Sequence, residues 1–327
     1  MTGEQSLLRY LSTAGGTLSP QPNKPHWLLR TRWTTMDEDT QSLGTSMSSS
    51  FVRQRRVFFL LAATSAIVAF TVPSVQAADS ACSARGADTV RQAYPAAKQV
   101  SEREIKLGVQ TIGLPADLGD NPHELICKTW PARPELTLFA VPLMTSQSED
   151  GNEGDIELLV VESDDLKLKH RLRLPDLLTD DAVFVSGVAF DTAYYRLSES
   201  EIAFGLRIER RGSSSPNPFG ETVLWLFVID NNELKPVLDN IVVAGHQGEW
   251  DTNCAGEFQT IERTLATGRL QPNRRSDILV SEKKTKTIST LGPDGECVDD
   301  KDAITTVRRL RFEGTAYQVP ENLKRID

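Results

Sequence analysis

The chain has 327 residues, with 45 Asp and Glu against 36 Lys and Arg, a formal net charge of −9. This acidic balance argues against nucleic acid and against anionic lipid as partners, because both are bound through a basic surface.

Residues 47–77 have the order of a secretory signal peptide. Three arginines within residues 53–56 precede an apolar run at 57–72, and small residues stand before Ala77. A basic end, a short apolar run and an A-x-A-like site are typical of such a leader, and the run is shorter than the roughly 20 residues of a membrane-spanning helix. We expect cleavage after Ala77, a periplasmic or secreted protein of a Gram-negative bacterium, and no stable membrane insertion after cleavage.

Two features in and before this leader leave alternatives open. Residues 54–60, Gln-Arg-Arg-Val-Phe-Phe-Leu, resemble the twin-arginine export motif, although the general secretory route serves such leaders as well. Residues 1–46 are rich in Ser and Thr and show neither helical nor alternating periodicity. Because a signal peptide works from the amino terminus, we expect translation to begin at Met47 and residues 1–46 to be a mis-assigned start. A disordered extension is the alternative.

The 250 residues after Ala77 keep 29 Lys and Arg and 41 Asp and Glu, a formal net charge of −12. This length suits a single all-β domain over residues 78–327.

All four cysteines lie in this part of the chain: Cys82, Cys127, Cys254 and Cys297. An even number of cysteines in an exported chain predicts two disulfides, with three possible pairings. Proximity in sequence favours Cys82 with Cys127 and Cys254 with Cys297. No C-x-x-C spacing occurs, so the cysteines do not indicate redox catalysis or a zinc site.

The predicted elements are one short helix followed by strands. Residues 83–94 form the helix candidate, and from Ile105 onward short β-rich runs alternate with turn residues. Strand candidates group into three units of four, at about 123–174, 182–244 and 256–320. We therefore predict an all-β fold of three irregular four-stranded antiparallel meanders, β-propeller-like or sandwich, with one short N-terminal helix.

Each unit ends in a hairpin with a polar turn, at residues 163–165, 230–232 and 313–315. The other strand candidates are residues 123–130, 135–144, 183–195, 201–210, 258–267 and 277–287.

The densest cluster of reactive residue types is the predicted loop 245–254. His246 is a candidate base, Glu249 and Asp251 are candidate carboxylates, and Trp250 and Asn253 are candidate contact residues for a ligand. The alternative is a turn-rich connection held by Cys254, with Trp250 packed in the core, and we slightly favour the core position for Trp250.

A second loop, residues 211–220, offers Phe219 as a contact residue at its tip. It has several serines but no G-x-S-x-G turn, so it does not indicate a serine nucleophile. The acidic run 149–155 offers oxygens for calcium without the spacing of a known calcium loop. We expect no cofactor and no metal site.

Three functions remain open at this point. The preferred one is a non-enzymatic envelope protein that binds another envelope protein or a small ligand through loops on a disulfide-stapled β scaffold. The first alternative is a glycosidase-like hydrolase that uses Glu249 and Asp251, since two carboxylates suffice for that chemistry. The second is a calcium-binding module.

Overall fold

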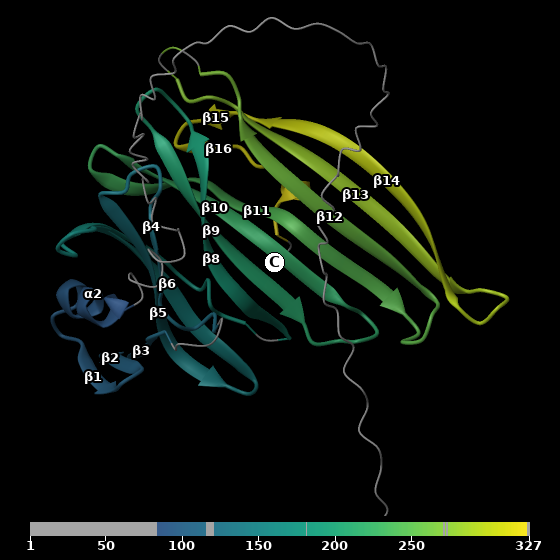
Figure 1. The fold of residues 1–327 in the computed structure, drawn as a ribbon, viewed down its shortest axis with the longest axis horizontal. Helices are drawn as coiled ribbons and strands as arrows, with labels where there is room; N and C mark the ends of the chain where they lie inside the picture. The colour runs from purple at the N-terminus through teal and green to yellow at the C-terminus, as the bar shows by residue number, and fades with distance from the viewer. Residues whose placement is uncertain (1–83, 116–120, 181, 271, 273, 326–327) are drawn as a thin grey trace, which may run out of the picture. The chain divides into compact units, whose positions relative to one another are not determined.

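A computed structural model describes residues 84–115, 121–180, 182–270, 272 and 274–325. They form two antiparallel sheets of seven strands, a two-stranded sheet and one short α-helix (Figure 1). The all-β class with a short helix near the start of the domain is confirmed. The predicted leader, residues 1–46 and Cys82 lie outside the described residues. Among the described residues, none of the helices has the length and apolar character that crossing a membrane requires.

The first sheet has the order β1-β2-β3-β5-β6-β7, with β4 paired to β5. Its strands are β1 (Lys98–Ser101), β2 (Glu104–Leu107), β3 (Gln110–Gly113), β4 (Ile126–Thr129), β5 (Leu136–Ser148), β6 (Gly151–Glu162) and β7 (Leu168–Leu174). The predicted unit 123–174 corresponds to β4–β7. Helix α2 (Gly86–Ala93) packs against this sheet, where Val90 joins Ile105, Phe139 and Leu159 in one apolar cluster.

The second sheet is one continuous meander in the order β14-β13-β12-β11-β10-β9-β8. Its strands are β8 (Val183–Arg196), β9 (Ile202–Gly212), β10 (Phe219–Asp230), β11 (Glu233–Trp250), β12 (Gly256–Thr267), β13 (Ile278–Leu291) and β14 (Cys297–Leu310). The turn between β10 and β11 holds Asn231 and Asn232 at φ 47° and 64°, the left-handed conformation that Asn tolerates in tight hairpins. The predicted hairpin turn at residues 230–232 is therefore present.

The two large sheets share a core. Leu138 and Leu158 of the first sheet and Phe204 and Phe227 of the second lie in one buried cluster, and Trp130 meets Phe204 edge to face at 5.2 Å. Of the two predicted arrangements, the sandwich-like one fits this packing. A second cluster on the later sheet includes Leu224 and Val280 and is covered by the C-terminal segment that carries Leu323.

Two boundaries differ from the prediction. The units 182–244 and 256–320 are joined, because β11 continues to Trp250 and pairs with β12. The loop predicted at residues 245–254 contains Gly245 and Gly248, and glycine weakens a strand. Gly248 is nevertheless within a strand, where a Cβ atom would lie 2.4 Å from Cδ1 of Phe258, so the glycine admits the neighbouring ring.

The third predicted hairpin is also much smaller than expected. The run 305–312 falls mainly within β14, whose partner is β13, and only β15 (Phe312–Glu313) and β16 (Ala316–Tyr317) pair around the turn at Gly314. A 3₁₀ turn, η1 (Glu321–Leu323), follows.

The far part of the second sheet has no core on either face. We call this part the distal sheet. It consists of residues 244–250 of β11, 256–262 of β12, 283–289 of β13 and 299–305 of β14, which pair in uninterrupted register. None of its residues in β12, β13 or β14 is buried, whereas the first nine residues of β5 are all buried.

Candidate functional site

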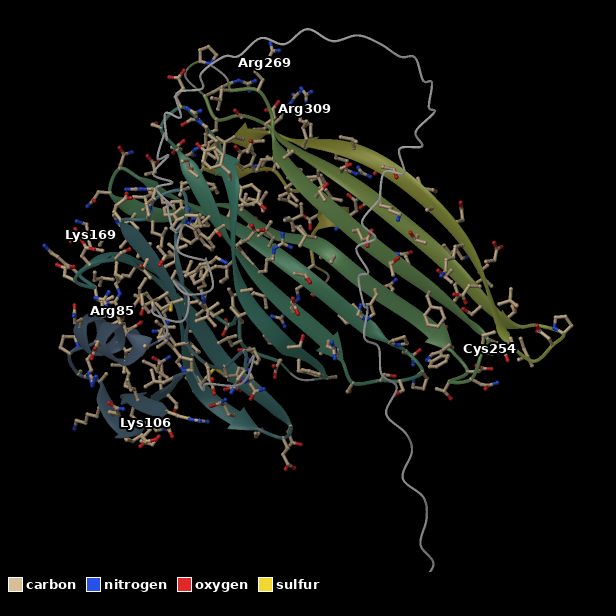
Figure 2. The ribbon with its side chains drawn as sticks, viewed as in Figure 1. Arg85, Lys106, Lys169, Cys254, Arg269 and Arg309 are labelled. Atoms are coloured by element: carbon tan, nitrogen blue, oxygen red, sulfur yellow. A yellow bond between two sulfur atoms is a disulfide. The ribbon has the colours of Figure 1, made fainter. Side chains whose placement is uncertain are left out.

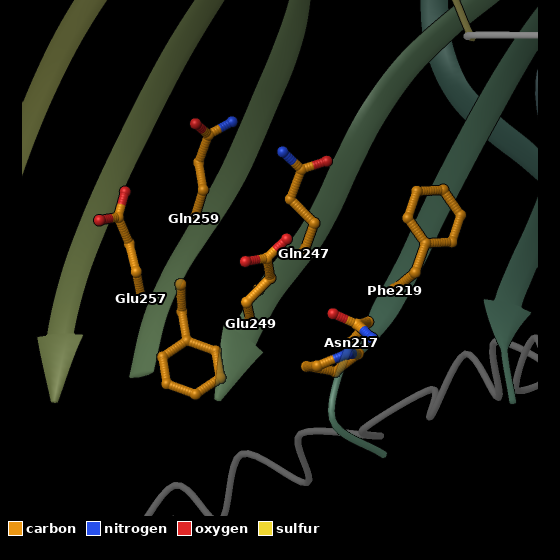
Figure 3. A pocket seen from close by; sticks show the side chains of 9 residues that line it. Asn217, Phe219, Gln247, Glu249, Glu257 and Gln259 are labelled. Carbon is orange, nitrogen blue, oxygen red and sulfur yellow. The ribbon is translucent and has the colours of Figure 1, made fainter. Parts of the chain in front are cut away.

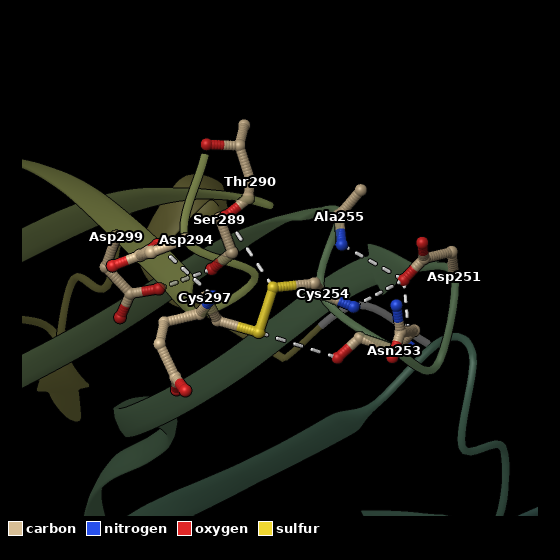
Figure 4. The surroundings of a disulfide bond; sticks show 10 residues. Asp251, Asn253, Cys254, Ala255, Ser289, Thr290, Asp294, Cys297 and Asp299 are labelled. Atoms are coloured by element: carbon tan, nitrogen blue, oxygen red, sulfur yellow. Dashed lines mark hydrogen bonds between the residues drawn. A yellow bond between two sulfur atoms is a disulfide. The ribbon is translucent and has the colours of Figure 1, made fainter. Parts of the chain in front are cut away.

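The distal sheet begins at a disulfide-bonded turn. Cys254 and Cys297 form a disulfide with a Cα–Cα separation of 5.5 Å, which joins the turn between β11 and β12 to the first residue of β14 (Figure 4). This pairing agrees with the one favoured by sequence proximity, and the bond is compatible with an oxidising compartment. Cys127 is also disulfide-bonded.

Asp251 organises this turn. Its Oδ1 accepts hydrogen bonds from the backbone N–H groups of Asn253, Cys254 and Ala255 at 2.9, 2.9 and 3.0 Å (Figure 4). These bonds, led by the one from Asn253, hold the pKa of Asp251 below its usual value because they favour the ionised carboxylate. Such a group is suited to shaping the turn and poorly suited to donating a proton.

Trp250 is half-buried and lies outside the core, so the expected core position is wrong. Its indole N–H donates to the carbonyl of Ser215 at 2.6 Å, and its ring lies 6.1 Å from that of Phe258. The backbone N–H of Trp250 also donates to the carbonyl of Pro216. Trp250 therefore holds the loop between β9 and β10 against the end of β11. Asn253 is exposed within the turn.

The side chains of His246 and Glu249 project from opposite faces of β11. They are three residues apart in a strand of unbroken register, and successive side chains of a strand alternate between the two faces. His246 lies over Gly220, on the face away from Glu249. The structure thus does not bring His246, Glu249 and Asp251 together as one constellation.

Glu249 lines an open hollow of about 630 Å³ at the end of β10, β11 and β12. We call this feature the polar hollow; its lining residues are Asn217, Pro218, Phe219, Gln247, Gly248, Glu249, Glu257, Phe258 and Gln259. Figure 3 shows Gln247 and Gln259 rising from neighbouring strands, with Phe219 on the other side of Gln247. Of the predicted contact residues, Phe219 lies here, and Trp250 and Asn253 do not.

Hairpin pairing builds the polar hollow. Gln247 faces Gln259 and Glu249 faces Glu257 across the β11–β12 ladder, while Phe219 faces Gln247 from β10. Facing residues of an antiparallel pair share one side of the sheet, so all five side chains project from the same face.

Several polar side chains of the polar hollow have no hydrogen-bond partner among the described residues. Two facing carboxylates repel one another, and Lys286 of β13 offsets this by an ion pair with Glu257 at 2.7 Å. Within the described residues, the side chains of Glu249, Gln247, Gln259 and Asn217 make no hydrogen bond or ion pair to protein. They are therefore free to bond solvent or a ligand.

Four lining residues of the polar hollow were not predicted as site residues: Gln247, Glu257, Gln259 and Asn217. The signal was present in the spacing, because Gln247 and Gln259 are equally far from the middle of the turn at Asn253. Such symmetry brings two residues face to face if the segment is a hairpin. A loop at residues 245–254, as the sequence predicts, would not place these two residues opposite each other.

The described part of the chain contains no cluster of candidate calcium ligands. No group of three or more His, Cys, Asp or Glu there is placed to hold a metal ion. In the acidic run 149–155, Asp155 accepts from the Arg173 guanidinium at 2.6 Å and from the backbone N–H of Asp176 at 2.9 Å.

Comparison of the chain with protein-family models, with curated proteins and with solved structures gives no significant match.

Proposed function

We propose that this chain is an exported, non-enzymatic envelope protein whose polar hollow binds a neutral ligand rich in hydroxyl and amide groups. The proposal of export is supported by the leader-like sequence at residues 47–77. An exported domain would lie in the periplasm or outside the cell. The observation that carries the binding role is the set of free polar side chains gathered on one face of a disulfide-stapled sheet.

The ligand class follows from the lining. Each Gln or Asn amide both donates and accepts hydrogen bonds, and the Glu249 carboxylate accepts them, which matches hydroxyl and amide groups. The half-buried ring of Phe219 adds an apolar surface at one side. Two carboxylates and a net charge of −12 on the domain disfavour an anionic ligand. The open shape of the polar hollow suits a segment of a longer polymer, and a glycan strand has this chemistry.

The hydrolase alternative receives less support from the geometry. A carboxylate pair for glycoside cleavage needs both groups facing the bond at roughly 5 to 10 Å. Asp251 is engaged by three backbone N–H groups in the turn, and it does not line the polar hollow with Glu249.

The test is binding of peptidoglycan glycan strands, freed of their stem peptides, and of soluble N-acetylglucosamine oligomers to the purified protein. Replacing Gln247 and Gln259 together by Ala removes two sets of hydrogen bonds. At about 1 kcal/mol each, the dissociation constant should rise by about 30-fold. Thermal stability should stay nearly unchanged, because neither side chain is buried.

The matched control is Thr260→Ala together with Thr285→Ala, at facing positions on the opposite side of the same sheet. These changes should leave affinity unaltered. Absence of binding to either glycan, or equal loss in both double variants, would refute the proposal. Shortening of the glycan strands by the protein would favour the hydrolase instead.

A further inference from the structure

The outer edge of β14 has no strand partner in the described part of the chain. β14 is the last strand of the second sheet and pairs only with β13, as Figure 1 shows for the strand drawn in yellow. Residues 297–309 are all exposed, and three of the exposed large apolar side chains belong to this strand: Val298, Ile304 and Val307. A long exposed edge is a template for pairing with another chain, and proteins usually block it.

This edge is held rigidly at both ends. Cys297 is tied by the disulfide to the neighbouring turn, and Leu310 is 1% exposed within the core beneath β15 and β16. Figure 2 labels Arg309 near one end of β14 and Cys254, the disulfide partner of Cys297, near the other. Because the strand is already extended and fixed, pairing with it requires little further ordering of the chain.

The acidic and basic charges along β14 are unevenly placed. Asp299, Asp300 and Asp302 occupy the first half with one lysine, Lys301, which forms an ion pair with Asp299 at 3.2 Å. Arg308 and Arg309 stand at the end, where Arg309 also lies 3.6 Å from Asp277. Asp300, Asp302 and Arg308 make no ion pair with any other described residue. Charges placed to block self-association would repel a second copy. These charges instead attract one that runs in the opposite direction.

We propose that β14 pairs antiparallel with β14 of a second copy of this chain, about a two-fold axis at Ile304. In this register Asp300 faces Arg308 and Asp299 faces Arg309, and the symmetry repeats each pair. Ile304 faces its own copy, and no two like charges are directly opposite. The result is one sheet continuous through both copies.

Neighbouring registers and the parallel arrangement fit less well. Moving the second strand by two residues one way places Lys301 opposite Arg309, and moving it the other way leaves no Asp opposite an Arg. A parallel pair would set Asp300 against Asp300 and Arg308 against Arg308. Like charges directly opposite are destabilising in a sheet.

The first experiment is a charge swap followed by sedimentation velocity on the purified protein. Asp300→Arg alone and Arg308→Asp alone each turn two attractive cross-strand pairs into repulsive ones, so each should raise the dimer dissociation constant by about tenfold or more. The double variant D300R/R308D restores opposite charges at both positions and should recover the dimer. Lys284→Glu, on the adjacent strand and away from the edge, is the control that should change nothing.

The second experiment reads the register. Ile304→Cys should give a disulfide-linked dimer on mild oxidation, because facing residues place their Cβ atoms about 5 Å apart. Thr306→Cys, on the same face, should not, because it lies opposite Asp302 and its own copy is four residues further along, roughly 13 Å away. A monomer at all concentrations, a dimer indifferent to the charge variants, or equal cross-linking of both cysteine variants would overturn the proposal. A dimer that forms only while residues 1–77 are attached would also overturn the proposal, because that segment, and not the pairing of β14 with β14, would then hold the two copies together.

Discussion

Individual side chains in this protein act mainly by joining strands. Arg263 is the fullest example among the described residues. Its guanidinium forms an ion pair with Glu282 of β13 at 2.6 Å and donates to the carbonyl of Val242 at 2.5 Å and of Leu323 at 3.5 Å. The side chain is 4% exposed. One residue of β12 therefore binds β11, β13 and the C-terminal segment where the core ends.

Replacing Arg263 by Met should lower the free energy of unfolding by about 3 to 5 kcal/mol, because Glu282 and two carbonyls lose their donor in a buried place. Chemical denaturation monitored by tryptophan fluorescence measures this. The matched control is Lys284→Met on β13, an exposed basic side chain whose loss should cost no more than about 0.5 kcal/mol. A second change, Glu282→Leu, should recover part of the Arg263→Met loss. Equal effects of the two Met variants would contradict this role.

The cluster of buried Tyr94, buried Glu157 and exposed Arg171 acts in a similar way at the first sheet. The Tyr94 hydroxyl donates to Glu157 at 2.5 Å, and Arg171 donates to both oxygens of the same carboxylate. Burial, followed by the hydrogen bond to Glu157, raises the pKa of Tyr94 well above its ordinary value. The hydroxyl consequently stays a donor, and it fixes the end of helix α2 to the sheet.

At the scale of elements, the second sheet has two parts of different character. β8, β9 and β10 carry residues of both apolar clusters, whereas the distal sheet depends on ladder hydrogen bonds, ion pairs and the disulfide. Local opening requires the least free energy where few apolar contacts are broken. The disulfide therefore restrains the part of the sheet that has the fewest other restraints.

Replacing Cys254 and Cys297 together by Ser should speed hydrogen exchange at residues 256–262 and 283–291 and leave β9 and β10 nearly unchanged. The two cysteines are 43 residues apart, and chain entropy gives such a link a stabilisation of about 4 kcal/mol at most. Exchange read by mass spectrometry of peptides checks this. Uniform acceleration over the whole chain would show instead that the disulfide supports the shared core.

At the scale of the whole molecule, the proposed export would determine which residues reach the folded protein. The apolar run at 57–72 and the small residues before Ala77 predict a mature chain that begins near Ala78. N-terminal sequencing of the protein from the periplasmic fraction should find this start. A mature protein that retains residues 47–77 would contradict it. Lysines in place of Arg55 and Arg56 would separate the two routes, because only the twin-arginine route requires the paired arginines.

Local patterns in the sequence predicted much of the fold. Short β-rich runs between turn residues predicted β5, β6, β9 and β10, and the Asp-Asn-Asn turn at residues 230–232 predicted the hairpin of β10 and β11. These features depend only on residues near in sequence, since a strand alternates its faces and a tight turn needs particular backbone angles. The Cys254–Cys297 pairing followed from proximity in the same way.

The candidate site depended on tertiary structure. Phe219 and Glu249 were predicted, but their meeting with Gln247, Glu257 and Gln259 required β11 to continue through Gly245 and Gly248. Those glycines look like a loop until Phe258 is seen beside Gly248. Likewise, an alternating strand has the same sequence pattern whether or not something covers it. Burial is a property of what packs against a strand, so only the three-dimensional arrangement decided that the distal sheet is uncovered and that β14 is an edge.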